Sequence, residues 1–279
     1  MEYKRSPFSL VLRILLIAAA AITAFVLGAI IVYILTKGIP HLKPELFAWE
    51  YNSENVSMMP AIINTILMVL LTLVIAAPIG IFSAIYLVEY AKRGNKLVKV
   101  IRMTAETLAG IPSIVFGLFG YLMFVISFRW GNSFLAGALT LAIMVLPTIM
   151  RTTEEALKAV PDAYRDGSFG LGAGRLRTVF QVVLPSAIPG ILSGVILSIG
   201  RIVGETAALI FTAGTIAAIP DSLMNSGRTL AIHMYALLNE GLYMDQAYAT
   251  AVVLLVMVIL INAVSGLVAK TFAKKTGEK

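Results

Sequence analysis

The chain has 279 residues, of which 59% are hydrophobic and 13% are charged, and its mean hydropathy is +0.90. Soluble domains carry about 25% charged residues, so this composition excludes an ordinary soluble domain and indicates a membrane protein. The absence of cysteine excludes disulfides and thiolate chemistry, and the two histidines, His41 and His233, are too far apart to suggest a metal centre. The net charge of +7 does not by itself indicate a nucleic-acid partner, and we expect none.

Six apolar stretches follow one another along the chain. Each is close to the roughly 20 residues that a helix needs to cross a bilayer, and long uninterrupted runs favour helices over barrel strands, which alternate apolar and polar residues. The first stretch follows three cations, as in a secretory signal, but it exceeds the about 7–15 residues of a signal core, so we expect it to be retained. The sequence therefore predicts an all-α, polytopic membrane protein with about six transmembrane helices. The stretches are residues 10–35, 61–88, 107–126, 135–150, 188–211 and 247–269.

Lys and Arg gather on one side of these six stretches. Of the 22 cations, seventeen fall at the two termini and in the connections after the second and fourth stretches, four fall on the opposite side, and Arg201 lies inside the fifth stretch. Because connections rich in Lys and Arg stay in the cytoplasm, both termini are predicted to be cytoplasmic, in a multi-pass protein of the inner (cytoplasmic) membrane. On the external side, an apolar segment at residues 230–238 could lie along the membrane surface.

This topology divides the chain into three parts. Residues 1–60 hold the first transmembrane helix and an external loop, and residues 61–270 hold five helices with a cytoplasmic loop at residues 151–187. Residues 271–279 form a basic cytoplasmic tail.

The cytoplasmic loop has the pattern of a helix, a turn and a second helix. The expected first helix covers residues 162–169, the turn residues 170–174 and the second helix residues 175–183. Gly172 can take a positive φ, which allows a sharp turn, and Pro185 fixes where the next helix begins. A motion of this loop would therefore reach the fifth transmembrane helix.

This loop resembles the cytoplasmic signature of the type I permeases of ABC importers. That signature has an acid-small-small tripeptide, a glycine four positions after it and a later Leu-Pro, and here Asp166, Gly167 and Ser168 are followed by Gly172 and by Leu184 with Pro185. The resemblance implies the type I permease fold, identifies residues 61–270 as an ABC transmembrane type-1 domain, and implies that the loop couples to an ATPase subunit. The alternative is that these glycines are only turn residues.

No Walker phosphate-binding string, G-x-x-x-x-G-K-[ST], occurs in the chain. We therefore expect a permease without its own ATPase site. The chain itself is expected to bind no cofactor, and ATP and Mg would belong to separate ATPase subunits.

Two charges lie inside the fifth apolar stretch. An ionisable group within a span costs roughly 2.5–3.5 kcal/mol, so Arg201 and Glu205 are candidate functional residues. Their spacing of four places them on one helix face, where they could pair. An arginine in a water-filled path suits an oxyanion because its planar fork binds phosphate oxygens. The alternative is an ion pair that only fixes helix packing.

Two longer segments resemble the phosphate permease subunits of this family, the PstA group. One is GETAAL at residues 204–209, which includes Thr206, and the other is ETLAGIPSIVFG at residues 106–117. The resemblance implies inorganic phosphate as the substrate, with Arg201, Glu205 and Thr206 on its path. It also implies four kinds of assembly partner or ligand: a second, PstC-like permease, two ATPase subunits, an external phosphate-binding protein and phosphate itself.

Pro112 should break or kink the third stretch, because it lacks a backbone donor and disfavours helical geometry in the residue before it. Half-helix ends at such breaks suit ions at mid-membrane depth, so Pro112 and Ser113 are further candidates for the path. A simple packed kink is the alternative.

Other functions remain open from the residues alone. Within the permease class the substrate could be molybdate, tungstate or sulfate. A secondary transporter or channel would usually show more helices and inverted repeats. An intramembrane enzyme would need a nucleophile that this pair of charges does not supply.

Overall fold

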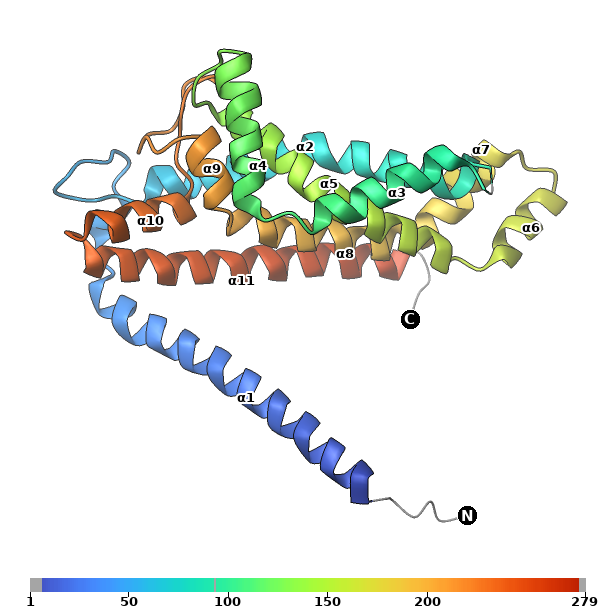
Figure 1. The fold of residues 1–279 in the computed structure, drawn as a ribbon, viewed down its shortest axis with the longest axis horizontal. Helices are drawn as coiled ribbons and strands as arrows, with labels where there is room; N and C mark the ends of the chain where they lie inside the picture. Colours follow the sequence, from blue (N-terminus) through green and yellow to red (C-terminus); the bar gives the residue numbers. More distant parts are fainter. Residues whose placement is uncertain (1–6, 93, 276–279) are drawn as a thin grey trace.

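The computed structural model describes residues 7–92 and 94–275, and within these ranges it contains helices and no strand (Figure 1). Lys4, Arg5, Arg93 and the end of the predicted basic tail, residues 276–279, lie outside the described residues. The helices are α1 (Pro7–Gly38), α2 (Met59–Ile85), α3 (Lys96–Ala109), α4 (Ser113–Gly120), α5 (Phe134–Ala159), α6 (Asp162–Gly170), α7 (Arg175–Thr178), α8 (Leu184–Val203), α9 (Ala207–Thr212), α10 (Leu230–Glu240) and α11 (Met244–Lys275). π-helical segments extend α2 over Tyr86–Tyr90, α4 over Tyr121–Ser127 and α7 over Val179–Val183.

The centre of the fold is a bundle in which α5 packs against α2 and α8, and α8 packs against α11 (Figure 1). Small residues bring these helices close together, as is usual for helix pairs in membranes. A Cβ atom on Gly80 of α2 would lie 2.8 Å from the Ile149 side chain of α5. A Cβ atom on Gly190 of α8 would lie 2.6 Å from Ala156 of α5. Glycines therefore allow the helices of the bundle to approach closely.

Five described helical stretches are long and apolar enough to cross a membrane. The remaining predicted span, the third along the chain, is a bent pair: α3 meets α4 and its π-helical extension at an angle of 106°. Pro112 stands at the bend between Ala109 and Ser113, so the break predicted from this proline is confirmed. The predicted stretch of residues 107–126 therefore covers the end of α3 together with α4 and its extension, on the two sides of this bend. In Figure 1, α4 points away from the long direction of the bundle, whereas α3 follows it.

The fifth span also differs from its predicted limits of residues 188–211. Its helical backbone runs without a loop from Arg175 to Val203, ends at Gly204 and resumes as α9. Pro185 lies in the first turn of α8, where proline fits, but a π-helical segment precedes it instead of a loop. The second helix of the loop and the transmembrane helix therefore form one continuous rod.

Outside the bundle, α1 extends away from the other helices and touches them mainly at its end (Figure 1). There Gly38 allows close approach, since a Cβ atom would lie 2.3 Å from the carbonyl oxygen of Tyr248 in α11. The external segment predicted at residues 230–238 is helical and lies within α10, which packs against α11. Whether it lies along the membrane surface stays a prediction, as does the division of the chain at residues 60 and 270.

Candidate functional site

The predicted helix-turn-helix at residues 162–183 is confirmed. The helix α6 ends at Gly170, the turn follows, and α7 begins at Arg175. Gly172 has a φ of +83°, which a side-chain-bearing residue rarely adopts. The turn is closed by backbone hydrogen bonds, including one of 3.1 Å from Ala173 N–H to the Ser168 carbonyl.

The small residues of this segment are not required by packing within the chain. A Cβ atom added at Gly167 or Gly172 would meet nothing within 4 Å, and Asp166 is exposed. Large apolar side chains are exposed around them. The segment thus presents an apolar and sterically open surface to its surroundings. The exposed apolar residues are Tyr164, Phe169, Leu171, Leu176 and Phe180.

The two short helices are tied to each other and to α8. The hydroxyl of Ser168 lies 2.8 Å from that of Thr178, which joins α6 to α7. Leu184 packs against a buried apolar cluster that includes Val183 and Leu157, and Pro185 is partly buried beside it. The helix α6 is therefore connected to α8 through a hydrogen bond and a continuous helical backbone.

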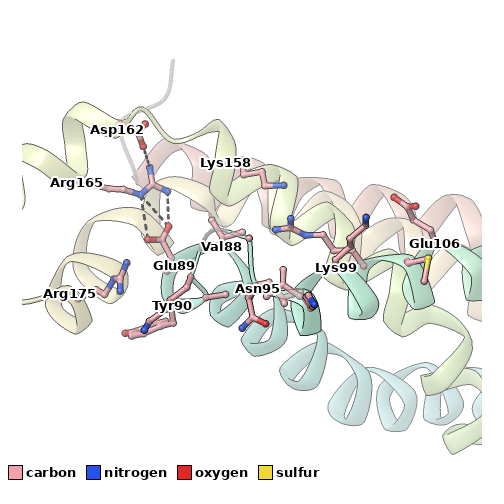
Figure 2. Close-up of a pocket in the computed structure, with 18 residues that line it drawn as sticks. Val88, Glu89, Tyr90, Asn95, Lys99, Glu106, Lys158, Asp162, Arg165 and Arg175 are labelled. Atoms are coloured by element: carbon pink, nitrogen blue, oxygen red, sulfur yellow. Dashed lines mark hydrogen bonds and ion pairs between the residues drawn. The ribbon is translucent and has the colours of Figure 1, made fainter.

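Sequence analysis missed a second connection, between Arg165 of α6 and Glu89 at the end of the second span. Nη2 of Arg165 lies 2.7 Å from Oε1 of Glu89, and its Nε lies 3.2 Å from the same atom (Figure 2). The guanidinium also donates to the carbonyls of Leu157 and Val160, at 2.9 and 2.8 Å. Both side chains are largely buried, so the fork of the arginine holds α6, α2 and the end of α5 together.

The structure does not pair Arg201 with Glu205. The expectation of a shared helix face is wrong, because α8 ends at Val203 and the chain changes direction before Glu205. The buried Glu205 carboxylate instead accepts a hydrogen bond of 3.1 Å from the Ala208 N–H, which stabilises the first turn of α9. Thr206 is partly buried, and its hydroxyl lies 3.4 Å from the Gly204 carbonyl.

Arg201 faces a cavity of about 650 Å³ between α5, α8 and α11. No ion pair involving its guanidinium occurs among the residues that the structure describes. The cavity is also lined by polar groups from three helices, namely Thr148, Ser193 and Asn262. Arg201 is therefore available for an anion, and Glu205 does not line this cavity.

Pro112 and Ser113 lie at the break between α3 and α4, away from the residues that line the Arg201 cavity. The two segments that carried the family resemblance nevertheless meet. A Cβ atom on Gly117 of α4 would lie 2.7 Å from Cα of Ala208 in α9, so the two backbones are in direct contact. The break at Pro112 thus brings α4 against the short helix that Glu205 begins.

Two further cavities continue from the Arg201 cavity toward α6. A cavity of about 400 Å³ shares Thr148 and Leu197 with the Arg201 cavity, and it shares Arg102, Glu106 and Lys158 with a larger one of about 1080 Å³. In the middle cavity, Arg102 lies 2.7 Å from Glu154, which also forms an ion pair with Lys158. The three cavities are therefore neighbours along α3, α5 and α8, each sharing lining residues with the next.

At the opposite end of the molecule, His233 of α10 is completely buried. Burial, with a smaller contribution from the charge of Arg228, lowers the pKa of His233 from 6.5 to about 3. The Arg228 guanidinium carbon lies 4.6 Å from the centre of the Tyr51 ring, within the range of a cation–π contact. No motif in the sequence indicates that His233, Arg228 and Tyr51 lie together.

The sequence of the chain is similar to those of known proteins over most of its length. Residues 76–278 match the family described as binding-protein-dependent transport system inner membrane component. The chain is 36% identical to the phosphate transport system permease protein PstA of Pasteurella multocida, over 82% of each chain. It is 33% identical to the probable ABC transporter permease protein YqgI of Bacillus subtilis, over 87% of this chain and 88% of that one.

Solved structures give the same fold at lower sequence identity. A chain of a bacterial alginate ABC transporter, crystallised with a periplasmic protein bound to an alginate pentasaccharide, is similar with a TM-score of 0.69 and 14% identity, covering 98% of this chain and 97% of that one. A chain of the inward-facing MetNI methionine ABC transporter has a TM-score of 0.58 and 18% identity, covering 87% and 97%. The chain therefore belongs to the family of binding-protein-dependent transport system inner membrane components, the permeases of ABC importers.

Proposed function

We propose that the chain is one of two permeases in an ATP-driven importer of inorganic phosphate. The observation that carries this proposal is Arg201, which faces a cavity lined by polar groups and has no carboxylate partner among the described residues. A guanidinium without a carboxylate partner can bind a tetrahedral oxyanion through paired hydrogen bonds. The PstA relatives, which are named as phosphate transport permeases, support phosphate as that oxyanion.

The proposed assembly follows from the exposed surfaces. The apolar surface of α6 and its turn would dock on an ATPase subunit in the cytoplasm, with two such subunits supplying ATP and Mg sites. This chain would then hydrolyse no ATP itself. A second, PstC-like permease would complete the path beside Arg201, and an external phosphate-binding protein would deliver phosphate at the α10 end. Both termini would lie in the cytoplasm, because the Lys and Arg residues gather at that side.

Phosphate uptake by the reconstituted importer tests this proposal. Arg201→Gln should lower uptake at least about tenfold, since hydrogen bonds to charged groups contribute about 1.5–3 kcal/mol, while the subunits still co-purify. Arg13→Gln, which removes an exposed arginine of α1, should leave uptake unchanged. Unchanged uptake by Arg201→Gln would remove this residue from the path. Uptake driven by an ion gradient without ATP would contradict the importer itself, and preferred uptake of sulfate or molybdate would contradict the choice of phosphate.

A further inference from the structure

A cavity that we call the basic cavity lies where α2, α3, α5, α6 and α7 meet (Figure 2). It has a volume of about 1080 Å³ and is lined by seven Lys and Arg side chains but only three carboxylates. Lys99, Lys158, Arg165 and Arg175 come to it from four different elements, so the positive charge is assembled by the fold rather than by one helix.

Much of the positive charge is not neutralised within the chain. Arg165 is paired with Glu89 and Asp162, and Lys158 shares Glu154 with Arg102. The remaining four cations have no ion pair among the described residues. They are Lys92, Lys96, Lys99 and Arg175.

The walls also contain polar groups without a hydrogen-bond partner. The hydroxyl of Tyr90 and Nε of Arg102 are both buried and unsatisfied within the described structure. Both residues line the basic cavity. Arg175 lies over the Tyr90 ring, 5.6 Å from its centre. Lys96, Lys99 and Arg175 are charged donors without an ion pair among the described residues, and together they favour binding of an anion that accepts several hydrogen bonds.

The basic cavity is also the last of the series that begins at Arg201. It shares Arg102, Glu106 and Lys158 with the middle cavity, which in turn shares Thr148 and Leu197 with the Arg201 cavity. The cations of the middle cavity are paired with Glu154 or Glu155, whereas each end cavity has at least one cation without an ion pair among the described residues. The basic cavity is therefore the neighbouring place where an oxyanion from Arg201 would next meet cations without a carboxylate partner.

We propose that the basic cavity is a second binding site for a phosphate group, separate from Arg201 and held by Lys96, Lys99 and Arg175. This proposal rests on the proposed function, because only in an importer does the basic cavity lie on the side where the substrate leaves. The phosphate group has two possible sources, free inorganic phosphate from the path or the headgroup of an anionic phospholipid. The second source is open because Leu97 and Val100, beside these lysines on α3, are exposed and apolar.

Binding to the purified full chain in nanodiscs tests the site without any transport. In nanodiscs of phosphatidylcholine alone, radioactive inorganic phosphate is titrated. In nanodiscs containing phosphatidylglycerol, native mass spectrometry measures the lipid that stays bound. The double variant Lys96→Gln with Lys99→Gln is expected to weaken the binding of one of these two ligands by about tenfold or more, because two unit charges near the anion are lost. The matched control, Lys37→Gln with Lys43→Gln, removes two exposed lysines at the opposite end and should change neither.

Each result decides the question. Loss of phosphate binding identifies free phosphate as the ligand, and loss of retained phosphatidylglycerol identifies the lipid headgroup. If the Lys96 and Lys99 variant binds both ligands as tightly as the control, and Arg175→Gln does so too, the site does not exist. Arg201→Gln should keep binding at the basic cavity, so failure of the transport proposal and failure of this site are distinguishable. Lys96 and Lys99 are exposed, so their replacement should leave the fold intact, and gel filtration of the variant chain checks this.

Discussion

Arg165 on α6 and Glu89 at the end of the second span are 76 residues apart in sequence, yet their side chains meet at 2.7 Å. Their ion pair connects the proposed ATPase-docking helix to a second element besides α8. A pull on α6 would therefore act on two spans at once, through the helical rod that continues α7 and through this pair. Arg165 is a positioning residue, because its guanidinium is engaged by Glu89 and by the carbonyls of Leu157 and Val160.

The Arg165 pair gives a prediction about unfolding. Arg165→Gln should lower the free energy of unfolding by about 3–5 kcal/mol, because it leaves the Glu89 carboxylate buried and unpaired. The double variant with Glu89→Gln should recover a large part of that loss, since no lone charge remains. Chemical denaturation of the full chain in detergent measures both. The control is Arg177→Gln, which removes an exposed arginine bound only to Gln181. Strictly additive losses in the double variant would show that the pair is not coupled.

The turn at Gly172 gives a prediction about coupling. Gly172→Val should destabilise the turn by about 1–2 kcal/mol, because a residue with a Cβ atom is strained at a φ of +83°. Gly174→Val is the matched control: its φ is −74° and its surroundings are equally open. We expect phosphate uptake per ATP hydrolysed to fall for Gly172→Val and to fall less for Gly174→Val. Equal losses at both positions would mean that bulk at the docking surface matters and turn geometry does not.

The contact between α4 and α9 gives a prediction about packing. Gly117→Ala places a methyl group 2.7 Å from Cα of Ala208, so the two helices must separate, at a cost of about 1–3 kcal/mol. Gly110→Ala in the same segment meets only an atom at 3.6 Å, which is ordinary contact, and should be nearly neutral. The thermal unfolding midpoints of the two variants, compared with the original chain, measure the difference. A Gly117→Ala chain as stable as Gly110→Ala would contradict the close approach of these helices.

His233 gives a prediction about pH. The pKa of the buried imidazole is lowered to about 3 in the folded chain, while the unfolded chain keeps about 6.5, so the unfolded state binds more protons between these values. The stability contributed by neutral His233 is therefore complete above pH 6.5 and is lost as the pH falls toward 3, by at most about 1.4 kcal/mol per pH unit.

The measurement is the unfolding midpoint between pH 7.5 and 4.5. His233→Gln should flatten this pH dependence, whereas His41→Gln, which changes a more exposed histidine, should not. Identical pH profiles for the original chain and His233→Gln would show that His233 is accessible to protons.

Sequence patterns predicted the features that are local in the chain. The apolar runs predicted the spans, Gly172 predicted the turn after α6, and Pro112 predicted the break in the third span. The predicted pair of Arg201 and Glu205 failed because helical spacing was assumed to continue through Gly204. A signal was present, since Gly-Glu-Thr can end one helix and begin another.

Contacts between distant segments could not be predicted from one sequence. Glu89 directly follows the second apolar stretch and Arg165 belongs to the cytoplasmic loop, and no local pattern relates the two. Only the packing of α5 between them shows that they meet. The same holds for the basic cavity, whose cations come from separate elements and appeared in the sequence only as support for the topology.

The position of α1 has a consequence for how the chain matures. No residue in the apolar part of this helix is buried against the rest of the chain, which leaves its sides to lipid or to a neighbouring subunit. During synthesis α1 is made well before α11, the helix that it touches. The contact between α1 and α11 can therefore form only after α11 has been inserted.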